Sequence, residues 1–273
     1  MEESAKCSDS PKYLFDNAAA QAGARFNALT EIFDPGTIRH LVDRGVDRGW
    51  HCLEVGGGNG SIAAWLGTRV GPRGRVLVTD IDTRFLDSLN QPNIEVERHD
   101  IVSGELPEGA FDLIHCRLVL LHLPNRDQVL RRMIAALKPG GWLVDEEFDS
   151  ASLPPDTTVN AAEVLPRTHL AMWRLLEDRG VERRFGRLLP GRLRAHGLTA
   201  VGAEGRVFMW EAGSPGASLT RANYDQIGAD LISAGYITHQ EFEMDIEKLE
   251  SPEFLMPSPI MWTAWGQRPS VSG

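Results

Sequence analysis

Residues 51–60 have the sequence His-Cys-Leu-Glu-Val-Gly-Gly-Gly-Asn-Gly. Its apolar residues, followed by glycines, predict a short buried strand that runs through Glu54 and ends in a turn. Gly56, Gly58 and Gly60 let the backbone turn sharply and approach a ligand closely, beside the N-terminus of a helix. The stretch therefore predicts a loop that binds a nucleotide-type cofactor.

The spacing of these glycines distinguishes two kinds of cofactor loop. Counted from Gly56, the dinucleotide fingerprint Gly-x-Gly-x-x-Gly requires a glycine at position 61, where the chain has Ser61. The pattern present is acidic-x-Gly-x-Gly-x-Gly, which resembles motif I of the class I S-adenosylmethionine (SAM)-dependent methyltransferases. An NAD-dependent oxidoreductase is an alternative against which Ser61 argues.

Strands and helices alternate after the glycine loop. The sequence predicts strands over 50–55, 75–80, 94–98, 111–116 and 142–148, and helices over 59–69, 83–90 and 126–137. This alternation predicts an α/β fold with a doubly wound, mostly parallel sheet that binds ligands at the carboxyl ends of its strands. The resemblance implies a Rossmann-like sheet of seven strands, and it is closest over residues 50–148.

The N-terminal segment, residues 1–45, is predicted to form a helical lid. Apolar residues recur at helical spacing from Asp16 to Phe33 and predict one helix there. Asp34-Pro35 has the pattern of a cap followed by the first residue of a second helix, which should cover about 36–44.

The remaining residues, 46–273, are predicted to form the methyltransferase domain. Strands are expected over 199–211 and 259–266, and the resemblance implies that the last two strands of the sheet are antiparallel. Helices within about 155–196 and 216–250 are expected to be inserted as a cap over the cofactor cleft.

The resemblance assigns roles to side chains at the ends of the strands. It implies that Glu54 accepts a hydrogen bond from the ammonium group of SAM, Asp80 from the ribose hydroxyls and Asp100 from the adenine amino group. Ile81 and Ile101 would cover the faces of the adenine ring. The backbone of His115-Cys116-Arg117 would run beside the methionine part. The expected cofactor-binding residues are therefore Glu54, Gly56, Gly58, Gly60, Asp80, Ile81, Asp100, Ile101, Cys116 and Arg117.

Three further residues are candidates for contact with the methyl acceptor or with the reacting groups. His122 follows the fourth strand and either acts as a general base or only packs there. Glu146 ends the fifth strand and either steers a cationic or N–H-bearing acceptor or lies at a solvated edge. Tyr13 precedes the first helix and either touches the cofactor or acceptor or only packs. No metal-ligand spacing is present, so we expect catalysis without a metal.

Composition limits the partners of the chain. A formal net charge of −10 over 273 residues disfavours sequence-independent binding to nucleic acid. No apolar run has the length of a membrane span, and the polar start of the sequence predicts no signal peptide. We therefore expect a cytoplasmic monomer or homodimer that meets neither nucleic acid nor membrane.

These patterns together predict SAM-dependent methyl transfer to a small, aromatic or heterocyclic secondary metabolite, with S-adenosylhomocysteine (SAH) as product. The resemblance is to bacterial small-molecule methyltransferases, with the indole C-methyltransferases as one neighbour. C-, N- and O-methylation all remain open. One alternative is a SAM-binding protein of the same fold that catalyses a reaction such as cyclisation. A nucleic-acid or protein methyltransferase is another, although Cys116-Arg-Leu-Val119 stands where amino-methylating nucleic-acid enzymes usually carry Asn-Pro-Pro-Tyr.

Overall fold

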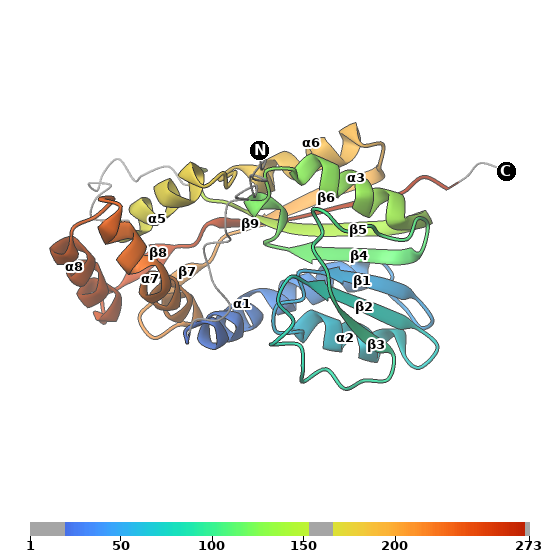
Figure 1. The fold of residues 1–273 in the computed structure, drawn as a ribbon, viewed down its shortest axis with the longest axis horizontal. Coiled ribbons are helices and arrows are strands. Elements are labelled where there is room, and N and C mark those ends of the chain that lie inside the picture. Colours follow the sequence, from blue (N-terminus) through green and yellow to red (C-terminus); the bar gives the residue numbers. More distant parts are fainter. Residues whose placement is uncertain (1–19, 153–165, 271–273) are drawn as a thin grey trace, which may run out of the picture.

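A seven-stranded sheet forms the centre of the computed structural model, which describes residues 20–152 and 166–270 (Figure 1). The strand order is β3-β2-β1-β4-β5-β9-β6, with β1 to β5 parallel and β9 antiparallel to both of its neighbours. The strands of this sheet are β1 (His51–Val55), β2 (Arg75–Asp80), β3 (Ile94–Arg98), β4 (Phe111–Arg117), β5 (Leu137–Asp149), β6 (Thr199–Arg206) and β9 (Ile260–Gln267).

Helices cover both faces of the sheet, so the central strands β1 and β4 bury most of their side chains on both sides. On one face α2 (Ser61–Val70) buries Ile62 and Leu66 against Val76 and Val78 of β2. On the other face lie α3 (Arg126–Ala136) and α6 (Phe185–Ala195), drawn above the sheet in Figure 1. The strand ends are therefore the edges at which polar side chains gather.

The C-terminal half adds a group of elements beyond the carboxyl ends of the strands (Figure 1). Tyr224 packs there in a shared apolar cluster with Phe33 and Met256. Two of the helix starts have clear capping signals, since the Ser214 side chain accepts a hydrogen bond from the next turn and Thr238 forms a capping box with Glu241. The group consists of α5 (Arg167–Asp178), β7 (Met209–Glu211), α7 (Pro215–Ser233), α8 (His239–Glu250) and β8 (Leu255–Pro257).

The N-terminal helix differs from its prediction, because α1 (Ala22–Asp43) runs without a break through Pro35. A proline inside a helix costs about 3 kcal/mol. Phe33 and Leu41 are fully buried, however, and each buried side chain of that size stabilises by about 1.5–3 kcal/mol. Asp34 does not cap a helix, and its carboxylate instead accepts a hydrogen bond from Arg117.

Three other segments differ from their predictions. Residues 83–90 form successive turns and not a helix, since the amides of Leu86 and Leu89 bond three residues back. The fifth strand begins at Leu137 instead of at 142, with a register shift opposite Phe111. The segment 199–211 divides into β6 and β7, and β7 pairs with β8 outside the main sheet.

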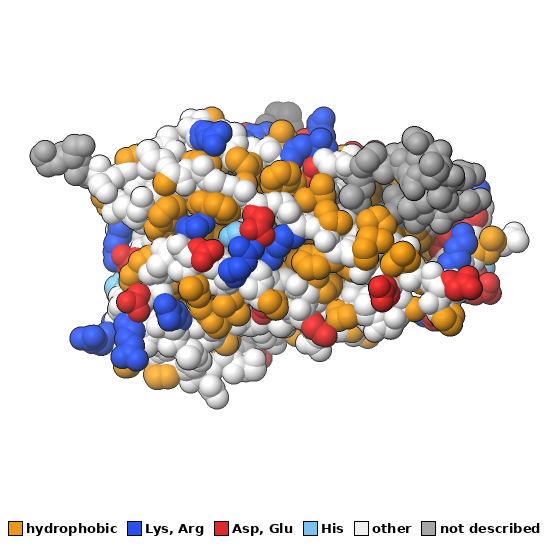
Figure 2. Space-filling model, turned by 180° about the vertical axis from the view of Figure 1, so that it is seen from behind, with side chains coloured by type: hydrophobic (Ala, Val, Ile, Leu, Met, Phe, Trp, Pro, Cys, Tyr) orange, Lys and Arg blue, Asp and Glu red, His pale blue; other side chains and the backbone are white. Residues whose placement is uncertain are grey.

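The surface shown in Figure 2 carries side chains of every type. Acidic and basic groups are interspersed there with hydrophobic ones. Among the helices of the described residues, none is both long and apolar enough to cross a membrane.

Candidate functional site

A cavity of about 430 Å³ opens at the carboxyl ends of β1, β2 and β4, and we call it the central cavity. The glycine loop and the neighbouring strand ends form its floor, and Phe26 and Leu29 of α1 form one wall. Leu176 of α5 and Val181 also line the cavity. Its volume falls in the range of about 300–1,000 Å³ that is typical of small-molecule sites.

The glycine loop needs glycine for reasons of backbone geometry. Gly56, Gly58 and Gly60 have φ values of 71°, 55° and 80°, in the left-handed region that side chains disfavour. A Cβ atom on Gly56 would lie 2.3 Å from a methyl group of Val119, and one on Gly58 would lie 3.1 Å from the Phe26 ring. Gly56 and Gly58 line the cavity as predicted.

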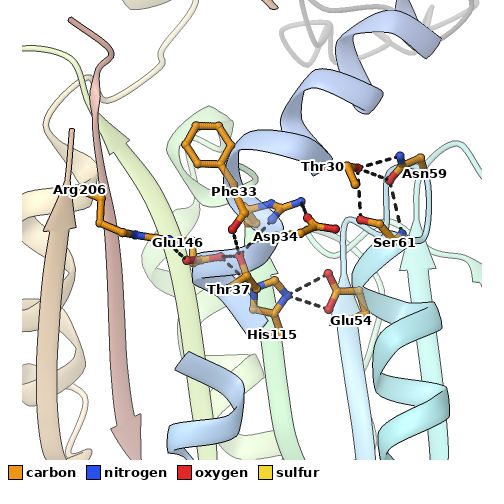
Figure 3. A network of polar contacts seen from close by, with 11 residues as sticks. Thr30, Phe33, Asp34, Thr37, Glu54, Asn59, Ser61, His115, Glu146 and Arg206 are labelled. Carbon is orange, nitrogen blue, oxygen red and sulfur yellow. Dashed lines mark hydrogen bonds and ion pairs between the residues drawn. The ribbon is translucent and has the colours of Figure 1, made fainter. Parts of the chain in front are cut away.

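Gly60 has a different position from the one predicted. It does not line the cavity but occupies the N-cap of α2 and packs against Leu89. Its neighbours Asn59 and Ser61 line the cavity instead and hydrogen-bond to Thr30 of α1 (Figure 3). The loop is thus joined to α1 by side chains that the motif did not single out.

The acidic and apolar residues at the ends of β2 and β3 line the same cavity. Asp80 accepts hydrogen bonds of 3.0 Å from the backbone amides of Gly58 and Asp82, and burial raises the pKa of its carboxyl group. Asp100 accepts from the Ser103 hydroxyl at 2.7 Å, which lowers the pKa of its carboxyl group. Ile81 and Ile101 line the cavity as well, so all four residues predicted at these strand ends lie at one site.

A buried histidine connects Glu54 to the interior of the protein (Figure 3). His115 Nδ1 lies 2.8 and 2.9 Å from the two carboxylate oxygens of Glu54, and its Nε2 lies 3.4 Å from Glu146. Burial opposes a charge on the ring, yet these two acids raise the pKa of His115 to about 9. Sequence reasoning gave a role to the backbone of His115 but none to its side chain, although a polar residue among the apolar residues of a strand paired with β1 was a usable signal.

Glu146 does not contact the cavity, contrary to the prediction that it reaches the acceptor. Its carboxylate is fully buried and accepts hydrogen bonds from Thr37, Thr263 and, at 2.8 Å, Arg206. Burial alone would raise its pKa, but these donors and His115 lower it to about 2. Glu146 therefore joins α1, β6 and β9 to β5 beneath the site.

Arg117 and Cys116 point to opposite sides of the sheet. Arg117 lines the cavity as predicted and donates to Asp34 at 2.9 Å and to Thr37 at 3.0 Å. Cys116 was predicted to bind the cofactor through its backbone, but it is fully buried and is not among the residues that line the cavity. Strand alternation is the reason, because consecutive side chains face opposite ways.

Cys116 instead faces two carboxyl groups, and the three ligand-type atoms lie within 4.8 Å of one another. Glu147 accepts hydrogen bonds from the backbone amides of Val119 and Leu120, at 3.1 and 2.6 Å, and so holds the turn after β4. The other carboxyl group belongs to Asp145. The cluster lies outside the central cavity, and we do not assign it as a metal site.

Replacing Asp145 with asparagine should flatten the pH dependence of stability. Burial raises the pKa of this carboxyl group from 3.8 to about 8, so the folded chain keeps a proton that the unfolded chain releases. The free energy of unfolding should therefore fall as the pH rises from about 4 to 8. Urea denaturation at pH 5 and pH 8 should show a fall that is smaller by roughly 1–3 kcal/mol in Asp145→Asn. An unchanged fall, equal to that of the surface control Asp225→Asn, would contradict this assignment.

His122 lines the cavity, and among the described residues it is the predicted candidate that could contact an acceptor. Burial, with Arg25 and Arg126 nearby, lowers the pKa of its imidazole to about 3. The ring is therefore neutral at ordinary pH and can accept a hydrogen bond, although so low a pKa makes it a weak general base. The other candidate, Tyr13, lies outside the described residues.

Comparison with known protein families finds a match over one part of the chain. Residues 53–143 match the family model described as a methyltransferase domain. The ubiquinone/menaquinone biosynthesis C-methyltransferase of Idiomarina loihiensis is 30% identical over 162 residues, which are 55% of this chain and 63% of that protein. The corresponding Pseudomonas putida protein is 34% identical over 46% of this chain and 54% of its own length. The chain thus spans less than two thirds of these relatives.

Solved structures show a similar fold over most of the chain. Phosphoethanolamine N-methyltransferase 2 of Haemonchus contortus, in complex with phosphomonomethylethanolamine and SAH, superposes with a TM-score of 0.60. The superposition covers 96% of this chain and 60% of the Haemonchus contortus chain, at 14% sequence identity. The YcgJ protein of Bacillus subtilis has a TM-score of 0.55 at 12% identity, over 87% of this chain and all of that one. These likenesses establish the architecture of the sheet and its helices.

Proposed function

We propose that this protein is a class I SAM-dependent methyltransferase, which transfers a methyl group to a small aromatic or heterocyclic acceptor enclosed by the central cavity. The observation that carries the proposal is the arrangement of the glycine loop, Glu54, Asp80 and Asp100 around one cavity. These groups come from successive parallel strands, whose carboxyl ends are the usual ligand site of such a sheet.

The residues present fit the cofactor. Cβ atoms at Gly56 and Gly58 would crowd Val119 and Phe26, so glycine keeps the loop in the conformation that faces the cavity. The Asp80 carboxylate, held by backbone amides, has lone pairs left for a diol. Glu54 would face a cationic ammonium group. SAM would supply a methyl group already activated on a sulfonium.

The remaining cavity wall favours an apolar acceptor. Beyond the strand ends, Arg25 and Arg179 line the cavity together with a larger set of apolar side chains, namely Phe26, Leu29, Leu118, Leu123, Leu176 and Val181. Apolar walls exclude water and hold a flat, apolar ring, and a few polar groups then set its orientation. His122, with its neutral ring, is one such group. The ubiquinone/menaquinone biosynthesis C-methyltransferases that resemble about half of this chain are consistent with a carbon acceptor.

The chain would accelerate the transfer by positioning and by excluding water. Holding two reactants in the reactive geometry can contribute about 7–11 kcal/mol to the lowering of the barrier. The backbone of the glycine loop and the carboxylates orient the donor, while α1 and α5 close the cavity on the acceptor side. Where the acceptor loses a proton, His122 can accept a hydrogen bond from it.

Replacing His122 with alanine should lower turnover while leaving SAH affinity nearly unchanged. A positioned hydrogen-bonding or proton-accepting group contributes about 10²–10⁴-fold, and the low pKa places the expected loss near 10²-fold. Steady-state kinetics and calorimetry with SAH would measure the two effects. His196→Ala, a surface-side histidine that does not line the cavity, is the matched control. A tenfold loss of SAH affinity would place His122 at the cofactor instead.

The proposed activity can be tested with methyl-labelled SAM and a panel of phenols, quinols and indoles. Release of SAH with label in a small aromatic product supports the proposal. Failure of SAH to bind, measured by calorimetry, would overturn the cofactor assignment. Binding of SAH without transfer to any member of the panel would favour a non-methylating reaction at the same site.

A further inference from the structure

The buried ring of His115 lies between two carboxylates, and the proposed function does not use it. Glu54, on one side, lines the central cavity, whereas His115 and Glu146 do not. The ring has no exposed surface, so it meets the cavity only through Glu54. Figure 3 shows these groups side by side between β1 and β5.

The second carboxylate leads from the ring to α1. Glu146 accepts a hydrogen bond from Thr37 (Figure 3). Arg117 donates to both Thr37 and Asp34 of the same helix. The N-terminal part of α1 carries Phe26 and Leu29, which form a wall of the cavity. The group that faces the ligand and the helix that covers it are thus connected through one imidazole.

We propose that His115 is a positioning residue, which orients the Glu54 carboxylate toward the cofactor and couples cofactor binding to the docking of α1 through Glu146 and Thr37. The inference rests on the proposed function, since it takes Glu54 as a ligand of the cofactor. It assigns to one buried residue the link between the floor and the lid of the cavity.

The chemistry of the ring explains why histidine suits this position. A protonated imidazole donates from two nitrogens on opposite sides, so it can satisfy two carboxylates at once. Glutamine can donate from only one end and carries no charge. Without His115, two buried acids would lose their shared partner, and an unpaired buried carboxylate turns away or takes up a proton. Glu54 would then present a poorer acceptor to a cation.

A double-mutant cycle in SAH affinity tests the link to Glu54. His115→Gln and Glu54→Gln should each weaken SAH binding about tenfold, the size expected for hydrogen bonds to charged groups. If His115 acts through Glu54, the double variant should also lose only about tenfold. His169→Gln replaces another buried histidine, bonded to Trp173, and should bind SAH like the wild type. Unfolding curves without ligand would confirm that each variant is folded.

Thr37→Val tests the link to α1. It should weaken SAH binding roughly threefold, and it should reduce the slowing of amide hydrogen exchange that SAH causes in residues 22–29. A hundredfold loss in the double variant, or a His115→Gln variant that binds like the wild type, would overturn the role of His115. Unchanged exchange in Thr37→Val would overturn the coupling. If the wild-type protein does not bind SAH, the proposed function fails instead.

Discussion

Replacing Asp80 with alanine is expected to weaken SAH binding more than tenfold. The carboxylate lines the central cavity and accepts hydrogen bonds from the Gly58 and Asp82 amides. Its loss removes the predicted bonds to the ribose hydroxyls, each worth about 1.5–3 kcal/mol when one partner is charged, and 1.4 kcal/mol corresponds to tenfold. It also removes a support of the glycine loop. Calorimetry with SAH at neutral pH measures the change.

Asp82 provides the control for this change. Its side chain pairs with Arg84 at 2.9 Å and does not line the cavity, so Asp82→Ala removes the same charge from a neighbouring position. SAH affinity should change less than twofold in that variant, as for most surface substitutions. Equal affinity of the Asp80→Ala variant and the wild type would exclude the ribose assignment.

Replacing Glu146 with alanine is expected to destabilise the fold by about 3–5 kcal/mol, the usual effect of removing one partner from a buried ion pair. His115 and Arg206 would lose their shared carboxylate, and Thr37 and Thr263 their acceptor. Urea denaturation at pH 6 measures the free energy of unfolding. Glu204→Ala, which breaks a half-exposed pair with Arg39, should cost less than about 1 kcal/mol.

The difference in the free energy of unfolding between the wild type and Glu146→Ala should depend on pH. The pKa of Glu146 is lowered from 4.5 to about 2, so its contribution is present above pH 4.5 and is lost as the pH falls toward 2. The pKa of His115 is raised from 6.5 to about 9, so its contribution is present below pH 6.5 and is lost as the pH rises toward 9. The difference should be largest between about pH 4.5 and 6.5. A loss below 1 kcal/mol in that window would contradict the buried network.

Local sequence patterns were sufficient to predict which strand ends line the central cavity beside the glycine loop. Strands at 75–80 and 94–98 have the predicted bounds, and Asp80 and Asp100 line the cavity beside the glycine loop. The physical reason is that strand alternation, turns and parallel topology bring successive strand ends to one edge. A chain in which strands and helices alternate in this way has few other arrangements that bury its strands.

The predictions failed where a side chain serves distant partners. The sequence predicts that Glu146 is a carboxylate at the end of a strand. In the structure its partners come from positions 37, 115, 206 and 263. Asp34-Pro35 reads as a helix start, yet Arg117 and the buried neighbours of Phe33 keep α1 continuous. A sequence window contains none of these partners.

Glycine spacing and apolar periodicity were enough to predict the doubly wound sheet and the turn of the glycine loop, because both act through local backbone geometry. Only the tertiary structure decided which acids face the cavity and which support it. It placed Glu54 at the central cavity and Glu146 in the interior, with His115 between them. The burial and pairing of a charge depend on elements far apart in the chain, and they determine whether a carboxylate binds a ligand or holds the fold together.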